Sequence, residues 1–454
     1  MKFISSNKSI TRLKAIIIIA LGVSFIFVSD ACHAQFNIDQ NEGSGYYNDN
    51  YLRLANYNYQ PNIKSVTLHR KDWPLSNAII DLNEDVTLEL SFDVLDSSLG
   101  NYMYSFVHCD HNWNQSDLSV QEYVDGPPED YLTEYDYSRN TFQKFIHYSL
   151  EIPNFNVRLT KSGNYIVKVY EAGNPDELVL TRRFSITEDL NDIQIGVKVH
   201  QATRVKERYS HQEVDFDIAF GNYELTNPYT DLHIVVLQNN CWENALIGLE
   251  PRFVKDRLLD YNYDGENTFP GQNEYRFFDI QNTRYNGQGV ERISFQNKEN
   301  HAYLVQDKSR SAITYLQRPD INGWYFIKTV QSNAVSAIDA DYVTLHFSLS
   351  QNSSIPNGDV YIYGALTDWK ITPEAKMQFN QSNLQYEANM YLKQGLYNYQ
   401  YVFVADGQST PDMSYFEGSH YETENDYTIL VYHRKIGLDY DRLIKTTEFK
   451  YTNN

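Results

Sequence analysis

Short runs of alternating apolar and polar residues recur along most of the chain. Leu88, Leu90 and Phe92, for example, alternate with Glu89 and Ser91. A period of two is typical of a β-strand with one buried face. The same pattern occurs in SVTLHR, DVTLELSFDVL, YMYSFVHC, NYIVKVYEA, LVLTRRFSIT, EVDFDIAF, LHIVVLQN, EYRFFDI, YVTLHFSLS, DVYIYGAL and YNYQYVFVA. No long stretch repeats apolar residues at helical spacing, so the sequence predicts an all-β protein.

The predicted strands are too numerous for one β-sandwich. At least eleven segments exceed the roughly seven to nine strands that a single sandwich holds. The pattern lapses over residues 35–59, which are rich in Asn, Gly and Tyr, over the polar residues 188–192, and near residue 336. We therefore expect an extended N-terminal arm over residues 35–59 and three β-sandwich domains in series, over residues 60–187, 188–335 and 336–454.

The first 34 residues have the pattern of a signal peptide. A basic segment precedes the apolar run of residues 15–28, and small, turn-prone residues follow up to Ala34. The apolar run is shorter than the roughly 20 residues that a membrane-spanning helix needs. We expect cleavage after Ala34, which leaves Gln35 as the mature N-terminus.

A lipoprotein signal is the alternative at this end of the chain. It would place the cleavage before Cys32 and attach lipid to that residue. Ser29 and Asp30 precede Cys32 at positions where a lipoprotein signal has small and branched apolar residues. The sequence therefore favours cleavage after Ala34, and lipidation of Cys32 is left open.

The chain is strongly acidic, with a formal net charge of −21 at pH 7. Residues 1–34 contain four basic residues and one acidic residue, so their removal brings the charge to −24. A field of this sign repels phosphate backbones and anionic headgroups, which argues against nucleic acid and lipid surfaces as partners. The charge fits solubility in general or complementarity to a basic partner.

Cysteine is sparse for an exported protein. After the predicted cleavage only Cys109 and Cys241 remain, in different predicted domains. Two thiols cannot build a disulfide framework, and a chain of about 420 residues can bury large cores without one. We expect two buried free thiols, with a disulfide between the domains as the alternative.

Two long segments resemble the plug protein family of the type IX secretion system. The first comprises IKSVTLHRKDWPLSNAIIDL from Ile63, NYMYSFVHCDHNWNQSDLSVQEYVDG from Asn101 and LTKSGNYIVKVYEAGNPDELVLTRRF from Leu159. The second covers residues 211–290, and both stand in that family's order and spacing. The resemblance implies a non-enzymatic periplasmic subunit that binds and seals the outer-membrane translocon. No motif marks the residues that contact the translocon.

The last quarter of the chain is similar to early-set immunoglobulin-like modules related to starch- and glycogen-binding domains. The similarity rests on GDVYIYGALTDWK from Gly358, NLQYEANMYLKQGLYNYQYVFVADG from Asn383 and EGSHYETENDYTILVYHR from Glu417. It implies immunoglobulin-like sandwiches and makes Trp369 the candidate for stacking on a sugar ring. The structural alternative is that Trp369 closes one end of the sandwich, and this alternative is favoured.

The segment HCDHNW contains several metal-ligating residue types within residues 108–111. On an extended strand His108 and Asp110 face one side, whereas Cys109 and His111 face the other, so the four cannot meet at one ion. We expect a strand end at which Trp113 packs and Asp110 begins a turn with its neighbours. No metal is predicted.

Two segments rich in carboxylates, residues 124–138 and 262–276, raise the question of calcium binding or glycoside hydrolysis. The first lacks the alternating D-x-D-x-D-G loop of a calcium site and sits between two strand patterns, and turn residues explain the second as a long connection between strands. No nucleophile elbow, phosphate-binding glycine loop or zinc-protease helix occurs. The sequence therefore predicts neither an enzyme nor a cofactor.

These observations together favour a periplasmic plug subunit of the type IX secretion system, associated with the outer membrane through its translocon. The alternative from a different class is a periplasmic or surface polysaccharide-binding protein that uses its C-terminal module and Trp369. An accessory domain of an enzyme is a third interpretation. The exposure of Trp369 distinguishes the first two.

Overall fold

The alternating segments form strands in the computed structural model, which describes residues 51–95, 98–331 and 333–452. The protein is mostly β, with 47% strand and 6% helix. All described residues belong to one compact unit that extends over residues 36–454. The predicted signal peptide, its cleavage site and Cys32 lie outside the described residues, as does most of the predicted arm.

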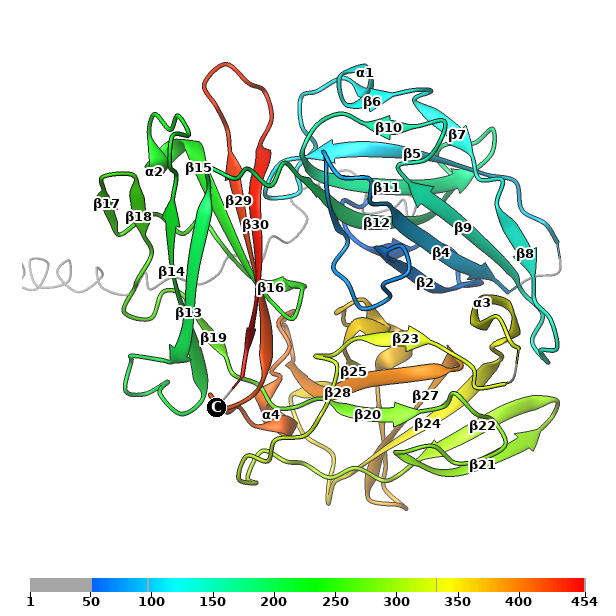
Figure 1. Cartoon of the computed structure of the whole chain (residues 1–454). Helices are drawn as coiled ribbons and strands as arrows, with labels where there is room; N and C mark the ends of the chain where they lie inside the picture. Colours follow the sequence, from blue (N-terminus) through cyan, green and yellow to red (C-terminus); the bar gives the residue numbers. More distant parts are fainter. Residues whose placement is uncertain (1–50, 96–97, 332, 453–454) are drawn as a thin grey trace, which may run out of the picture. The chain divides into compact units, whose positions relative to one another are not determined.

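The first sandwich is formed by two sheets from residues 57–187 (Figure 1). One sheet has the order β1 (Tyr57–Asn58), β12 (Leu178–Thr187), β11 (Gly163–Glu171), β5 (Tyr102–Cys109) and β7 (Glu129–Tyr131), with β3 (Ile79–Asp81) also on β12. The other has the order β2 (Ile63–Arg70), β4 (Leu88–Val94), β9 (Ile146–Ile152) and β8 (Tyr135–Tyr137). A small sheet joins β6 (Val124–Asp125) to β10 (Arg158–Leu159). Phe92 and Tyr148 from one sheet pack on Tyr102 from the other, so the apolar faces enclose one core.

The second sandwich combines residues 194–270 with the C-terminal residues 425–451. Its first sheet has the order β13 (Gln194–Gln201), β14 (His211–Ala219), β18 (Leu258–Asp260) and β17 (Phe253–Lys255), with β19 (Thr268–Pro270) also on β14. Its second sheet has the order β16 (Cys241–Ile247), β15 (Leu232–Gln238), β29 (Asn425–His433) and β30 (Arg442–Tyr451). Figure 1 shows the red strands β29 and β30 beside the green strand β15. Phe216, Ile234 and Ile429 meet in the core between the sheets.

The third sandwich lies within residues 276–405 of the chain. One sheet has the order β20 (Arg276–Asp279), β28 (Gly395–Ala405) and β23 (Tyr325–Ile327), with β25 (Gly358–Tyr363) also on β28. The other has the order β21 (Val290–Gln296), β22 (Glu299–Leu304), β24 (Tyr342–Ser350), β27 (Gln385–Lys393) and β26 (Gln378–Asn380). Phe278 and Tyr399 from the first sheet both pack on Phe347 from the second.

Helical segments are single turns in the described part of the chain. They are α1 (Val120–Tyr123), α2 (Pro228–Asp231), α3 (Ser336–Asp339), α4 (Ser414–Glu417), η1 (Ala365–Thr367) and η2 (Pro373–Ala375). Among the residues that the structure describes, no helix has the length and apolar character needed to cross a membrane.

The sheet pairings cross the division that the sequence predicts between residues 335 and 336. Strand β22 precedes this position and pairs with β24 after it, and β23 likewise pairs with β28. The second sandwich, in turn, is completed by β29 and β30 from the far end of the chain. Position 335/336 is therefore not a boundary between sheets, because strands from both sides of it share each core.

Buried polar contacts connect the first sandwich to the other two. Lys393 at the end of β27 lies 2.5 Å from Asp93 on β4, and both side chains are almost completely buried. Burial lowers the pKa of Lys393, and the charge of Asp93 opposes this shift. Tyr432 on β29 donates a hydrogen bond of 2.8 Å to Asn164 on β11. Because such pairs need fixed partners on both sides, they hold the sandwiches in one arrangement.

Candidate functional site

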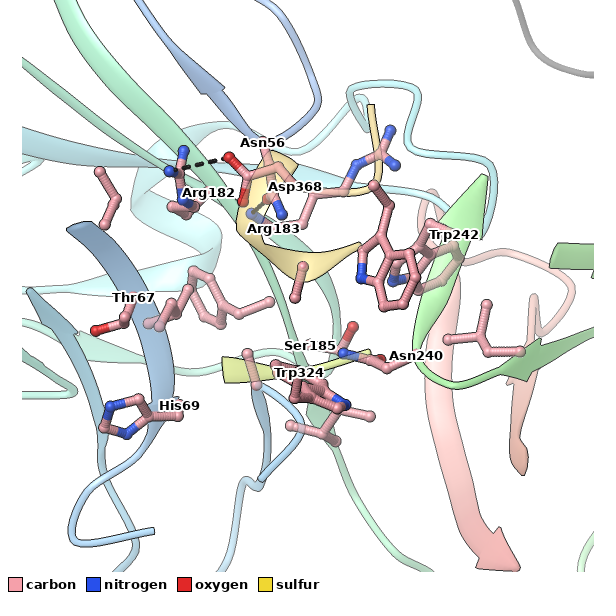
Figure 2. Close-up of a pocket in the computed structure, with 18 of the residues that line it drawn as sticks. Asn56, Thr67, His69, Arg182, Arg183, Ser185, Asn240, Trp242, Trp324 and Asp368 are labelled. Carbon is pink, nitrogen blue, oxygen red and sulfur yellow. Dashed lines mark hydrogen bonds and ion pairs between the residues drawn. The ribbon is translucent and has the colours of Figure 1, made fainter. Parts of the chain in front are cut away.

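A cavity of about 120 Å³ lies where the three sandwiches meet. Four of the five tryptophans of the chain line it: Trp113, Trp242, Trp324 and Trp369. The other walls come from β2 and β12 of the first sandwich and from η1 of the third. Figure 2 shows Trp242 and Trp324 beside the hollow, with Arg182 and Asp368 along another wall.

Two of these tryptophans have left-handed backbone conformations. The backbone φ angle is 65° at Trp113 and 58° at Trp369. Bulky residues seldom adopt this region, and its cost of about 1–3 kcal/mol must be offset by surrounding contacts. Trp113 follows the turn in which Asp110 Oδ1 accepts a hydrogen bond of 2.8 Å from the backbone of Asn112. This turn confirms the strand end expected at HCDHNW.

The neighbours of Trp369 explain its burial. Its side chain is only 8% exposed and packs edge-on against Tyr275 and Tyr363. A Cβ atom on Gly323 would lie 2.2 Å from the Trp369 ring, so this glycine makes room for the indole. The glycan-binding alternative needs an exposed Trp369, and the structure does not place it on the surface.

Charged side chains stand beside the indole rings. The guanidinium of Arg183 lies 4.5 Å from the ring centroid of Trp113, within the range of a cation–π contact. Arg182 forms an ion pair of 3.2 Å with Asp368, which is the dashed line in Figure 2. Arg182 also donates a hydrogen bond of 2.7 Å to Asn58 Oδ1, so β1 is fixed against this wall of the cavity.

One buried donor of the cavity lining has no partner. Trp113 is 5% exposed, and its indole Nε1 has no hydrogen-bond partner in the described part of the chain. A buried donor without an acceptor costs about 1–3 kcal/mol.

Two further cavities adjoin the tryptophan-lined one. One of about 710 Å³ shares Val66, Tyr325 and Ala365 with it, and Lys64 and Lys370 line it as well. The other, of about 310 Å³, shares Asn240 and Trp324. The three hollows therefore follow one another along the seam between the first sandwich and the others. We call this row of hollows the seam groove.

The remaining residues of HCDHNW separate as the strand geometry predicts. His108 is buried and contacts Ser116 Oγ and the Ser162 carbonyl, and burial lowers its pKa. Cys109 lies in the core, where burial raises the pKa of its thiol to about 12. Cys109 and Cys241 are both free and buried, which confirms the expected free thiols.

His111 is the residue of this motif that meets other ligand types. His111, His233 and Asp441 offer nitrogen and oxygen atoms that all lie within 4.8 Å of one another. The two imidazole rings are parallel, however, with centroids 4.0 Å apart. Nitrogen lone pairs lie in the ring planes, so two stacked rings do not direct them at one ion. His111 Nδ1 instead contacts Asp441 Oδ2 at 2.7 Å, and Arg434 holds the other carboxylate oxygen.

The carboxylates of the two acidic segments do not converge. Tyr170 donates to Glu129, and Asn156 donates to Asp130, at separate places along β7. In the second segment Asp264 pairs with Arg252, and Glu266 pairs with Arg204. These four carboxylates thus each have their own partner, as in ordinary strand connections.

Trp113 and Trp369 were expected at two separate places in the fold, and their position around one cavity was not predicted. Trp242 and Trp324 carried no local signal, since Trp242 is a single aromatic residue in a strand and Trp324 begins a run of three aromatic residues that is ordinary for a buried strand. Only the packing of three sandwiches brings the four rings together.

Comparison with known proteins places the chain in a family. The model described as the first domain of the type 9 secretion system plug protein matches residues 63–188. A crystal structure of a hypothetical protein from Parabacteroides merdae ATCC 43184 is similar at 35% sequence identity with a TM-score of 0.84. That match covers 88% of this chain and 100% of the other. No curated protein matches the chain.

Proposed function

Because the chain belongs to the type IX secretion system plug protein family, we propose that it binds the outer-membrane translocon of this system from the periplasm and seals it. The match over the first sandwich is the observation that carries the proposal. A channel wide enough for folded cargo leaks when idle, and a folded body at its mouth would prevent this.

The fold suits a sealing body for a physical reason. Sandwiches cross-linked by buried pairs such as Asp93 with Lys393 present a preformed surface, so docking costs little ordering entropy. The strongly acidic surface favours a basic docking face on the translocon. Binding of this kind requires neither catalysis nor a cofactor, and we assign neither.

The proposed location is the periplasm, next to the outer membrane. The family and the predicted signal peptide of residues 1–34 both support this location. A mature protein that starts at Gln35 would reach the translocon as a soluble subunit. Burial of Trp369 leaves no observation in favour of the polysaccharide-binding alternative.

Permeability of cells with idle channels tests the sealing role. Deletion of the gene should increase uptake of a bulky hydrophilic antibiotic such as vancomycin, while secretion continues. Uptake should return to its original level when the translocon barrel is also deleted. Unchanged uptake, in cells shown to contain assembled and unoccupied channels, would exclude sealing.

Affinity purification of the native protein from its own membranes tests the binding step. The proposal predicts recovery of a very large outer-membrane barrel. Recovery of soluble enzymes or glycan alone would contradict it.

A further inference from the structure

Strand β8 forms an open edge of the first sandwich. It is the last strand of its sheet, and in the described part of the chain it pairs with β9 alone (Figure 1). The ladder extends beyond β8 at both ends. Ser149 N–H donates 3.1 Å to the carbonyl of Glu134, and Ser138 N–H donates 3.0 Å to the carbonyl of Phe145. Residues 134–138 are therefore held in an extended conformation along the edge of the sheet.

The backbone groups of Tyr135 and Tyr137 face away from β9. In an antiparallel ladder, the N–H and C=O groups of every second residue face the same neighbouring strand. Glu134 and Ser138 bond toward β9, so the groups of Tyr135 and Tyr137 lie on the free side. Among residues 51–95, 98–331 and 333–452, no hydrogen bond joins these groups to another segment. An edge of this kind can accept a further strand.

The side chains of this edge form one apolar and one acidic face. Tyr135 and Tyr137 pack edge-on with ring centroids 6.0 Å apart, and Tyr135 also contacts the buried ring of Tyr148. The two rings continue the core to the edge of the sandwich, where they are 41% and 57% exposed. Successive side chains of a strand point to opposite faces, so Glu134 and Asp136 lie on the other face, exposed to solvent. An added strand would have tyrosine rings beside one face and carboxylates beside the other.

The negative charge along β8 has no cation beside it. Residues 124–138 contain five carboxylates and no lysine, arginine or histidine, and within the described residues none of the five forms an ion pair. Arg139, the next basic residue, is paired with Asp339 at 2.8 Å. Strand β13, also the last strand of its sheet, instead contains Lys198 and no carboxylate.

This charge determines which strand the edge can accept. Charged side chains on an edge strand oppose pairing with a strand of the same sign. The carboxylates of β8 therefore repel a second copy of this acidic chain and attract a basic strand.

We propose that β8 accepts a further β-strand from a partner protein, in which basic and apolar residues alternate. The backbone of the added strand pairs with the two tyrosines of β8, its basic side chains lie beside Glu134 and Asp136, and its apolar side chains cover the tyrosine rings. The proposal goes beyond the proposed function, because it does not require the translocon as the partner. Its test uses peptides and the isolated protein, so its failure leaves the sealing experiment unaffected.

Fluorescence anisotropy of a labelled peptide tests strand addition to the mature protein. The probe is a heptapeptide in which arginine and valine alternate. One comparison peptide has glutamate in place of arginine, and a second has serine in place of valine. A third carries N-methyl groups on its three central residues, which remove strand hydrogen bonds but not charge. We expect the probe to bind most tightly, with about a tenfold loss for the N-methylated peptide, and to weaken as salt is added.

Three variants locate the binding on β8. Glu134→Lys combined with Asp136→Lys reverses the charge of the acidic face and should weaken binding about tenfold. Glu250→Lys combined with Asp256→Lys is the matched control, because these residues are exposed on the second sandwich and the net charge changes equally. It should bind the probe like the parent. Tyr137→Ser should reduce the preference for valine over serine in the peptide. Melting temperatures verify that each variant is folded.

Three results would each overturn the proposal. The first is equal affinity of the two double variants for the probe, which would make binding a general effect of net charge. The second is equal affinity for the probe and the N-methylated peptide, which would mean contact without strand pairing. The third is tighter binding of the glutamate peptide.

Discussion

The imidazole of His111 lies parallel to that of His233, at an angle of 1° and with 4.0 Å between the ring centroids. His111 follows β5 of the first sandwich, and His233 belongs to β15 of the second. Asp441, just before β30, accepts from His111 and is also paired with Arg434. The stack is thus a titratable contact between two sandwiches.

Protonation of His233 should loosen this contact. Burial, followed by the neighbouring charge of His111, lowers the pKa of His233. The unfolded chain takes up this proton near pH 6.5 while the folded protein does not, so stability is lost as pH falls below that value. His233→Phe keeps the packing and removes the titration. We expect its melting temperature to fall less than that of the parent between pH 7.5 and 5.5; parallel curves would contradict this.

The buried pair of Asp93 and Lys393 should be sensitive to removal of one partner. Lys393→Met leaves the Asp93 carboxylate buried with Tyr342 and His147 as its remaining side-chain partners. We expect a loss of about 3–5 kcal/mol in the free energy of unfolding, measured by urea denaturation.

An exposed pair provides the matched control for this substitution. Lys376 and Asp359 lie 2.7 Å apart with side chains that are 43% and 45% exposed. Lys376→Met should leave the free energy of unfolding almost unchanged, because solvent screens such pairs. Equal losses for the two methionine variants would show that burial does not determine the effect.

Glu274 should make the protein less stable as the pH rises. Burial raises its pKa from 4.5 to about 7, and a hydrogen bond from Tyr315 opposes the shift. The folded protein therefore keeps a proton that the unfolded chain releases between pH 4.5 and 7, and stability falls across this window. Burial also raises the pKa of nearby Asp320 to about 6, which acts in the same direction.

Replacement of this carboxyl group by an amide tests the effect. Glu274→Gln should stabilise the protein at pH 8, by up to about 3 kcal/mol, and change little at pH 4.5. Denaturant unfolding at the two pH values gives the comparison. If Glu274→Gln destabilised the protein equally at the two pH values, Glu274 would have to be ionised at both of them.

Trp369→Ala should cost stability. A buried tryptophan truncated to alanine typically loses about 3–5 kcal/mol, and Trp369 is 8% exposed. Trp73→Ala is the comparison, because Trp73 is 56% exposed and should cost about 0.5 kcal/mol or less. A Trp369→Ala protein that melts like its parent, yet loses binding to an α-glucan that the parent binds, would support the polysaccharide-binding alternative.

Local alternation predicted the strands well because it depends on which neighbours face a core. The run DVTLELSFDVL contains β4, and YNYQYVFVA lies within β28. Pairing partners were not predictable in the same way. Strand β28 pairs with β20, β23 and β25, and its own sequence does not indicate which strands it pairs with. Strand β13 has the same alternation at Ile195, Val197 and Val199, yet it was not among the predicted segments.

The candidate site was predictable only in part. Trp113 was expected to pack at a strand end, and Trp369 at a sandwich end, and both are buried. Their common cavity depends on contacts among all three sandwiches, which lie far apart in the sequence. The stack of His111 on His233 has the same origin, since it joins residues of two sandwiches.

The C-terminal strands have a consequence for how the chain is made. Leu232 on β15 pairs with His433 on β29, so the second sandwich begins near the middle of the polypeptide and is completed by its last strands. Synthesis and export both deliver the chain from its N-terminus. The apolar faces of β14 and β15 therefore remain exposed until the residues of the third sandwich have been synthesised and exported. Such exposure slows folding and favours aggregation. A nonsense codon shortly before residue 425 would remove two of the four strands of one sheet, and with them Tyr427, Ile429, Val431 and Ile444 of the hydrophobic core, rather than a dispensable tail.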